Sequence, residues 1–372
     1  MSDTTERATN GEQLLRVDDV YKHFKVSGTG FFGKGAEYVH AVDGVSLDVR
    51  EGETLGLVGE TGCGKSTLAR CITGLHPVSS GSITFDGVNL TKLSRRKMRP
   101  YRSGIQMIFQ DPYGSLNPRR RVGSIIGDPF VIHTTDTGQQ RKRRVQELMQ
   151  LVGLNPEHYN RFPSDFSGGQ RQRIGIARAL ALRPRLIVCD EPIAALDVSI
   201  QAQVLNLLDE LQDEFGLTYV FIAHDLSAVQ HISDRIAVMY LGKVAEIAET
   251  PQLADHPRHP YANALMSAAP VADPQRADQR EQIVLSGDMP SPIHPPAGCR
   301  FHPRCPKAQQ RCIDEDPPLT ARLNDPWDHR TACHFPVEDG EQLGAAAAAV
   351  GTAGSSQEAA ANTNGSEARY NR

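Results

Sequence analysis

The sequence predicts an α/β protein built on a mainly parallel sheet, with a β-rich opening, an inserted helical segment and a small cysteine-rich C-terminal extension. Short apolar runs alternate with helix-like segments, which is typical of a parallel sheet covered by helices. A glycine-rich loop of the pattern G-x-x-x-x-G-K-[ST] follows one such run and opens a helix. After about residue 270 the chain becomes rich in proline and then in cysteine, which indicates a separate, smaller unit.

The N-terminal part is expected to be β-rich. Apolar and polar residues alternate from Leu14 and again over residues 38–49, which predicts two strands separated by a glycine-containing loop at 27–35. Residues 81–87 predict a further strand that ends in an Asp-Gly turn. The polar residues 1–13 are expected to be disordered.

The loop at residues 59–67 is expected to hold the phosphates of a nucleoside triphosphate. It lies between an apolar strand at 54–58 and a helix at 66–73, so backbone N–H groups and a helix N-terminus point at one place. Lys65 supplies a positive charge for the β- and γ-phosphates, and Ser66 offers a hydroxyl ligand to Mg²⁺. A chance glycine-rich turn is the alternative, which the flanking elements disfavour. The predicted ATP-binding loop consists of Gly59, Glu60, Thr61, Gly62, Cys63, Gly64, Lys65, Ser66 and Thr67.

Residues 113–183 predict an inserted helical subdomain, with the clearest helices at 145–152 and 170–182. The basic residues 141–144 precede apolar residues at helical spacing, which favours a solvated helix face over a polyanion-binding patch. The second helix opens with Ser167, Gly168, Gly169 and Gln170. This segment could meet phosphate at a helix N-terminus or serve as a plain helix cap.

Two carboxylates follow the apolar run at 186–189. Ligands bind at the carboxyl ends of parallel strands, where Asp190 and Glu191 are expected to lie. Asp190 suits the anchoring of Mg²⁺, and Glu191 suits a general base that orients water for phosphoryl transfer. The alternative is an exposed strand end without function. A helix at 200–215 and strands at 218–223, 235–240 and 243–249 complete the predicted α/β core.

Length and charge limit the function classes. With 372 residues the chain exceeds one ordinary domain, and we expect an ATPase domain at 14–270, an extension at 271–340 and a disordered tail at 341–372. The 40 Lys and Arg nearly balance 44 Asp and Glu, which argues against a globally basic nucleic-acid binder. Without a long apolar run or a signal-peptide core, the sequence predicts a cytoplasmic protein.

Four of the seven cysteines cluster in the extension with the spacing C-x5-C-x6-C-x20-C. Few large apolar residues surround them, so the extension is expected to need a cross-link or a metal to fold. In a reducing compartment metal ligation is favoured over disulfides. Four cysteines suit zinc or an iron-sulfur cluster, although the compact C-x2-C spacing of many zinc sites is missing. The predicted ligands are Cys299, Cys305, Cys312 and Cys333.

Taken together, these motifs resemble the ATPase subunits of the ABC family. The phosphate loop, the Ser-Gly-Gly-Gln segment at 167–170, the strand ending in Asp190-Glu191-Pro192 and His224 stand in the family's order and spacing. The Ser-Gly-Gly-Gln element is nearly diagnostic, because other phosphate-loop ATPases lack it. Ala194 departs from the serine that is more usual in the following loop.

The resemblance implies roles for further residues. Gln110 would contact Mg²⁺ and sense the membrane partner, and His224 would contact the γ-phosphate. Asp197 matches the conserved aspartate of the family's D-loop. An aromatic residue normally stacks on adenine, and either Phe24 or Tyr38 would do so here. The family's domains pair head to tail, so each ATP would also meet the Ser-Gly-Gly-Gln segment of a partner.

A narrower resemblance, over about residues 14–335, is to oligopeptide/dipeptide importer ATPases, in particular the F-type subunit. It rests on the segments 109–119 and 197–203 and on the cysteine-rich segment 290–306. It implies an ATPase that powers peptide import, peripheral to the cytoplasmic face of the membrane. Its expected partners are a D-type paralogue, two permease subunits and an extracytoplasmic peptide-binding protein, with no nucleic acid.

The same resemblance favours a 4Fe-4S iron-sulfur cluster in the extension, with zinc or metal-free cysteines as alternatives. Importers of related solutes such as nickel or glutathione are alternatives for the transported substrate. The main rival class is a soluble ABC ATPase acting on nucleic acid or ribosomes. Such proteins usually carry two ATPase cores or a long coiled-coil insertion, and neither is present in this sequence.

Overall fold

The computed structural model describes residues 11–26, 36–268, 283–323, 325–326, 328–341 and 343. Disorder was predicted for residues 1–13, of which 1–10 lie outside the described residues, and the prediction is wrong at its end because Gln13 begins a strand. The predicted loop at 27–35 and residues 344–372 of the predicted tail also lie outside the described residues.

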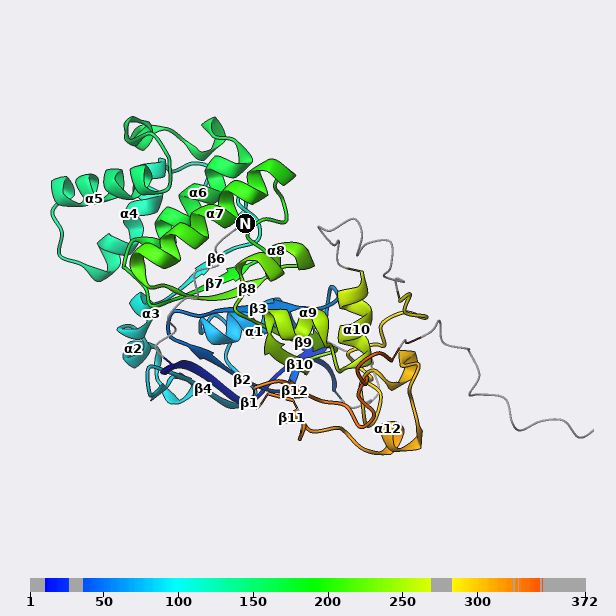
Figure 1. The fold of residues 1–372 in the computed structure, drawn as a ribbon. Helices are drawn as coiled ribbons and strands as arrows, with labels where there is room; N and C mark the ends of the chain where they lie inside the picture. The colour runs from blue at the N-terminus through cyan, green and yellow to red at the C-terminus, as the bar shows by residue number, and fades with distance from the viewer. Residues whose placement is uncertain are drawn as a thin grey trace, which may run out of the picture.

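An eight-stranded sheet forms the centre of the protein (Figure 1). Across the sheet, its strands are β11 (Thr320–Ala321), β12 (Arg330–Thr331), β10 (Lys243–Glu249), β9 (Arg235–Tyr240), β3 (Thr54–Val58), β8 (Thr218–Ile222), β7 (Leu186–Asp190) and β6 (Ile105–Ile108). The five strands from β9 to β6 are parallel, and the other three add antiparallel pairs at one edge. Every residue of β3, β7, β8 and β9 is buried, as expected where both faces of a sheet are covered. The predicted parallel α/β core is confirmed.

A second, antiparallel sheet contains the strands predicted for the N-terminal part. Its order is β2 (Glu37–Arg50), β1 (Gln13–Val26), β4 (Ser80–Phe85) and β5 (Val88–Asn89). The predicted Asp-Gly turn joins β4 to β5, and both turn residues have positive φ. Helix α1 (Lys65–Ile72) contacts strands of both sheets, so the phosphate loop lies where the two sheets meet.

The predicted helical segment contains α4 (Val122–His133), α5 (Gly138–Leu151) and α6 (Gly168–Leu180), which Figure 1 shows together with α7 (Val198–Phe215) above the parallel sheet. The basic residues of α5 are part of a solvated face. Arg144 pairs with Asp136 at 2.7 Å and lies over the ring of Phe130. Arg143 pairs with Glu147 one turn away.

Several elements were not predicted individually, and all of them except α4 have eight residues or fewer, which is too short to show much periodicity. Besides β5, β6 and α4, they are η1 (Leu90–Lys92), α2 (Arg95–Met98), α3 (Tyr101–Gly104), η2 (Pro156–Asn160), η3 (Pro163–Asp165), α8 (Leu226–Ile232), α9 (Thr250–Asp255) and α10 (Pro260–Ser267).

The cysteine-rich extension packs beside the β10 edge of the central sheet (Figure 1). Its regular structure is limited to η4 (His302–Arg304), α12 (Gln310–Asp314) and the two-residue strands β11 and β12. Strand β12 pairs with β10, so the extension continues the sheet of the core. Two residues expected to begin a disordered tail pack against this body instead. Glu341 pairs with Lys307 at 2.6 Å, and Leu343 is buried.

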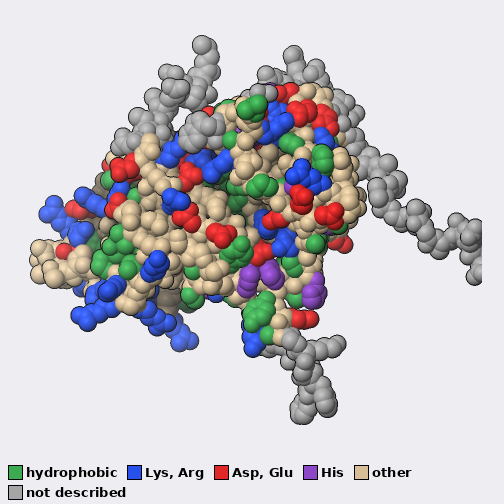
Figure 2. Space-filling view, turned by 90° about the horizontal axis from the view of Figure 1, so that it is seen from below, with side chains coloured by type: hydrophobic (Ala, Val, Ile, Leu, Met, Phe, Trp, Pro, Cys, Tyr) green, Lys and Arg blue, Asp and Glu red, His purple; other side chains and the backbone are tan. Residues whose placement is uncertain are grey.

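Acidic and basic side chains are interspersed over most of the face that Figure 2 shows, and Lys and Arg gather toward its left end. Among the described residues, none of the helices has the length and apolar character needed to cross a membrane.

Candidate functional site

The phosphate loop is shaped by a close approach of two backbone segments. Gly64 has φ 110°, and a Cβ at this position would lie 2.0 Å from the carbonyl oxygen of Ala41 in β2. Only glycine meets both conditions. The Nζ of Lys65 donates to the carbonyl oxygens of Gly59 at 2.7 Å and Glu60 at 3.1 Å. The loop therefore encloses the ammonium group that the sequence predicts for the phosphates.

Asp190 lies beside the loop at the carboxyl end of β7. Its side chain is 2% exposed, and Oδ1 accepts a hydrogen bond of 2.7 Å from the hydroxyl of Ser66. A hydroxyl and a carboxylate oxygen at this distance are the hard oxygen ligands that Mg²⁺ prefers. The two residues therefore fit the predicted magnesium site.

Glu191 is held in a strained conformation next to Asp190. Its φ of 48° is unusual for a residue other than glycine, and its N–H donates to the carbonyl of Ile222 in β8 at 2.9 Å. The side chain accepts a 2.7 Å hydrogen bond from Nε2 of Gln110, and Nδ1 of His224 lies 3.8 Å from the same carboxylate oxygen. Gln110, Glu191 and His224 thus come from three strand ends and meet at one edge of the sheet.

The Ser-Gly-Gly-Gln segment forms the N-terminus of α6. Ser167 and Gln170 make a reciprocal capping box, a local pattern that the sequence also carries as S-x-x-Q. Gly169 is buried, and a Cβ there would lie 2.4 Å from Cγ2 of Ile200 in α7. Within the described part of the chain, no hydrogen bond or ion pair joins residues 167–170 to the phosphate loop. Asp197 is exposed just before α7.

The two candidate aromatic residues lie on neighbouring strands. Phe24 in β1 packs edge-on against His76 with ring centroids 5.6 Å apart, and the ammonium of Lys22 lies 4.8 Å from its ring centre. Tyr38 in β2 is 43% exposed and pairs in register with Lys25. Stacking of either residue on adenine stays a prediction.

Two partners of the phosphate loop were missed by sequence reasoning. The N–H of Glu60 donates to the hydroxyl of Tyr261 in α10 at 2.8 Å, and its carboxylate accepts hydrogen bonds of 3.0 Å from Arg304 of the extension. Neither partner belongs to a recognisable motif, and both are about two hundred residues or more away.

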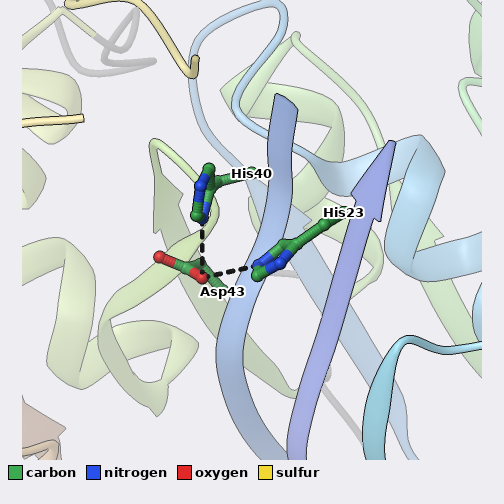
Figure 3. A group of neighbouring side chains, drawn as sticks. All are labelled: His23, His40 and Asp43. Atoms are coloured by element: carbon green, nitrogen blue, oxygen red, sulfur yellow. Dashed lines mark hydrogen bonds and ion pairs between the residues drawn. The ribbon is translucent and has the colours of Figure 1, made fainter. Parts of the chain in front are cut away.

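His23, His40 and Asp43 form a second cluster, between β1 and β2 (Figure 3). Both imidazoles hydrogen-bond to Oδ1 of Asp43, at 2.9 and 3.3 Å, and Arg300 of the extension donates to Oδ2. Burial opposes ionisation of Asp43, but these hydrogen bonds and the positive charge of Arg300 outweigh it and lower the pKa of the carboxyl. By distance alone the group could hold a metal ion, but the guanidinium opposes a second cation there. We assign the cluster to docking of the extension.

The four cysteines predicted as ligands line one small cavity, together with His259 and Phe301. All four are free thiols. Burial raises the pKa of Cys305 and of Cys333 to about 12 each, and the neighbouring cysteines contribute to the rise.

Comparisons with known proteins agree with this architecture. A family model for the ABC transporter matches residues 42–194, and one for the oligopeptide/dipeptide transporter C-terminal region matches residues 245–312. The oligopeptide transport ATP-binding protein AppF of Bacillus subtilis is 51% identical over 329 residues, which are 88% of this chain and 99% of that protein. OppF of Escherichia coli is 51% identical over 322 residues, 86% of this chain and 95% of that protein.

Among solved structures, a dimeric ATP-binding cassette in a post-hydrolysis state with ADP and Pi bound matches with a TM-score of 0.57. The identity is 28%, and the match covers 64% of this chain and 99% of that chain. The relatives are transport proteins, which does not favour a soluble ABC ATPase acting on nucleic acid or ribosomes. The chain belongs to the family of ATP-binding ATPase subunits of oligopeptide/dipeptide ABC transporters.

Proposed function

We propose that the chain is one half of a paired ATP motor that powers the import of oligopeptides or dipeptides through a membrane ABC transporter. The main observation behind this proposal is that the chain is 51% identical to oligopeptide transport ATP-binding proteins over nearly their full length. The subunit associates with transmembrane permease components and binds ATP, typically with Mg²⁺. We place it at the cytoplasmic face of the membrane, where an extracytoplasmic peptide-binding protein would deliver substrate to the same transporter.

We assign the chemistry to the side chains that meet at the edge of the parallel sheet. The backbone of residues 59–67 and Lys65 bind the triphosphate, and Ser66, Gln110 and Asp190 would hold Mg²⁺, which supplies charge neutralisation at the phosphates when bound. Glu191 orients the attacking water and accepts its proton. This role is supported by the 2.7 Å hydrogen bond that fixes its carboxylate to Gln110 and by its place next to Asp190. His224 contacts the γ-phosphate.

The site needs a second chain for completion. Ser167 and Gln170 satisfy each other in a capping box, and among the described residues no hydrogen bond or ion pair joins residues 167–170 to the loop of the same chain. Their helix N-terminus is thus available to an ATP held by a partner. The dimeric state of the matching ATP-binding cassette supports this arrangement. Asp197, exposed beside the segment, would lie at the same junction, and the partner we propose is a D-type paralogue.

The extension would hold a 4Fe-4S iron-sulfur cluster through Cys299, Cys305, Cys312 and Cys333. The gathering of all four cysteines around one cavity supports a shared metal site, and the resemblance to this importer group favours the iron-sulfur cluster over zinc. Iron and sulfide assays on anaerobically purified protein test it. A colourless protein with one equivalent of zinc would refute the iron-sulfur assignment.

The function is tested by assembling the chain with its permease subunits and paired ATPase in lipid vesicles. We expect ATP hydrolysis that rises when the peptide-binding protein and a peptide are added, together with peptide accumulation. A transporter assembled with the Ser167→Arg variant of this subunit serves as a control. The substitution blocks the helix N-terminus that this subunit offers to the ATP bound by its partner. An ATP hydrolysis rate that is unchanged by the permease and by the peptide would contradict the proposal.

A further inference from the structure

Two arginines of one short turn in the extension contact elements of the ATP site. The turn at residues 299–305 is closed by hydrogen bonds from the N–H of His302 to the carbonyl of Cys299 at 3.1 Å and from the N–H of Cys305 to the carbonyl of His302 at 3.3 Å. Arg300 pairs with Asp43 in β2, and Arg304 pairs with Glu60 in the phosphate loop. The turn thus lies between two of the cysteines and carries both contacts.

The Arg304–Glu60 pair is partly shielded from solvent. The side chain of Arg304 is 9% exposed and that of Glu60 is 31% exposed. One guanidinium nitrogen, Nη1, donates to both carboxylate oxygens at 3.0 Å, and Nε donates to the carbonyl of Ser286 at 3.3 Å. Charge-assisted hydrogen bonds in a partly dry setting are stronger than exposed ion pairs. The contact therefore holds Glu60 in one position.

Glu60 is fixed at all three of its polar groups. Its N–H donates to Tyr261, its carbonyl accepts from Lys65, and its carboxylate accepts from Arg304. Tyr261 packs against Tyr240 and against Phe301 of the same turn, with ring centroids 4.8 and 5.4 Å apart. The entry to the phosphate loop is thus set jointly by the core and the extension.

The charge of Glu60 opposes the function of the loop that contains it. A carboxylate one residue after Gly59 repels the triphosphate that the same backbone holds, unless a cation neutralises it. Lys65 faces the loop carbonyls, so the cation at this carboxylate is Arg304. Arg300 neutralises Asp43 in the same way, two residues beyond the Ala41 carbonyl that faces Gly64.

We infer that Arg304 is a positioning residue of the ATP site, which neutralises and orients Glu60 so that the folded extension raises the affinity of the phosphate loop for ATP. The inference rests on the proposed function only in that residues 59–67 bind ATP. Because coupling between two sites is reciprocal, ATP binding must also stabilise the turn at 299–305.

The test compares Mg-ATP affinity of the full chain and its variants by equilibrium dialysis. We expect Arg304→Ala to weaken binding by roughly three- to tenfold, the effect of one unshielded charge near the triphosphate. Arg304→Lys should be intermediate, since it keeps the charge but loses the guanidinium geometry. The Arg304→Ala/Glu60→Gln double variant should regain most of the affinity. Arg311→Ala is the matched control, because Arg311 lies in the same extension and its side chain pairs with the exposed Glu315.

Wild-type affinity in Arg304→Ala, or a double variant as weak as the single one, would overturn the inference. Hydrogen exchange of the wild type gives a readout that needs no variant: uptake at residues 299–305 should fall when Mg-ATP is added, and unchanged uptake would also overturn it. Failure of the wild type to bind ATP would instead refute the proposed function. Circular dichroism and metal content, compared among the variants, identify loss of folding.

Discussion

Strand β7 and the cysteine-rich extension are held in place by different forces. Every residue of β7 is buried between neighbouring strands, with one face packed against helices and the other against α1 and residues of the antiparallel sheet. Between residues 283 and 343 the described chain has only one five-residue helix, one three-residue 3-10 turn and two strands of two residues. The extension buries Phe301 against Tyr240 and Tyr261 of the core, and it adds a set of ion pairs that β7 lacks. These pairs are Arg300–Asp43, Arg304–Glu60, Arg330–Asp48 and His329–Glu246.

This contrast distinguishes the parallel-sheet core, which carries the proposed catalytic residues, from the extension, which is proposed to tune the ATP site. Burial of apolar strands stabilises the core and does not depend on the screening of charges by salt, whereas the ion pairs of the extension weaken with salt and with acid. Substitutions in the core should therefore change turnover, and substitutions at the junction should change stability and nucleotide affinity.

The largest expected effect belongs to the core. Glu191→Gln removes the proposed base but retains an oxygen for the hydrogen bond from Gln110. We expect a loss of about 10²- to 10⁴-fold in ATP turnover of the assembled transporter with ATP binding preserved. Phosphate release and ATP dialysis measure the two quantities, and Glu249→Gln is a control on an exposed strand end. Turnover at the wild-type rate would remove Glu191 from the mechanism.

The second-largest effect is expected at the buried carboxylate of Glu246, which joins β10 to the extension. Glu246 is 0% exposed and accepts hydrogen bonds from the N–H groups of Arg258 and His259 at 2.7 Å and from His329 at 2.6 Å. Glu246→Ala leaves three buried donors without an acceptor, and should lower the free energy of unfolding by about 3–5 kcal/mol. Urea unfolding of this variant and of Glu249→Ala, which should change by less than about 0.5 kcal/mol, tests the contrast.

A smaller loss of stability is expected when the pH is lowered. Burial lowers the pKa of His259 to about 3, and its Nδ1 accepts the N–H of Tyr261. Between this value and the ordinary pKa of 6.5 only the unfolded chain binds the proton, so stability falls as pH falls through this window. At pH 5 the loss should be about 2 kcal/mol relative to pH 7. His259→Asn keeps a cap for α10 without titrating, and should lose less stability over the same interval; an equal loss would contradict the assignment.

The smallest effect should come from the exposed edge of the junction. Asp316 of the extension pairs with Lys243 of β10, and its side chain is 50% exposed. Asp316→Asn should change the free energy of unfolding by about 1 kcal/mol or less, and by less still in high salt. Unfolding at low and high ionic strength measures the difference. A loss as large as that in Glu246→Ala would show that exposure does not weaken the junction's ion pairs.

The sequence alone determined the parts of this protein that follow local rules. Alternation and apolar runs predict β1, β2, β3, β7 and β8 to within a few residues, because burial on one face or both dictates the pattern. The phosphate loop can also be predicted from the sequence, because it follows local rules. Its backbone conformation requires glycines, and Lys65 and Ser66 occupy fixed positions in the sequence pattern. The placement of Asp190 and Glu191 at one edge follows from parallel strands that end there, whereas Gln110 was implied by the family resemblance alone because the strand before it was not predicted.

The tertiary structure alone decided how the extension meets the ATP site. Arg304 lies 244 residues from Glu60, and Arg300 lies 257 residues from Asp43. Strands β11 and β12 have two residues each, too few to show a period. Such contacts depend on which surfaces the folded layers bring together. The sequence does not specify which arginine pairs with which carboxylate. Only the packing of the extension against the edge of the sheet selects the pair that reaches the phosphate loop.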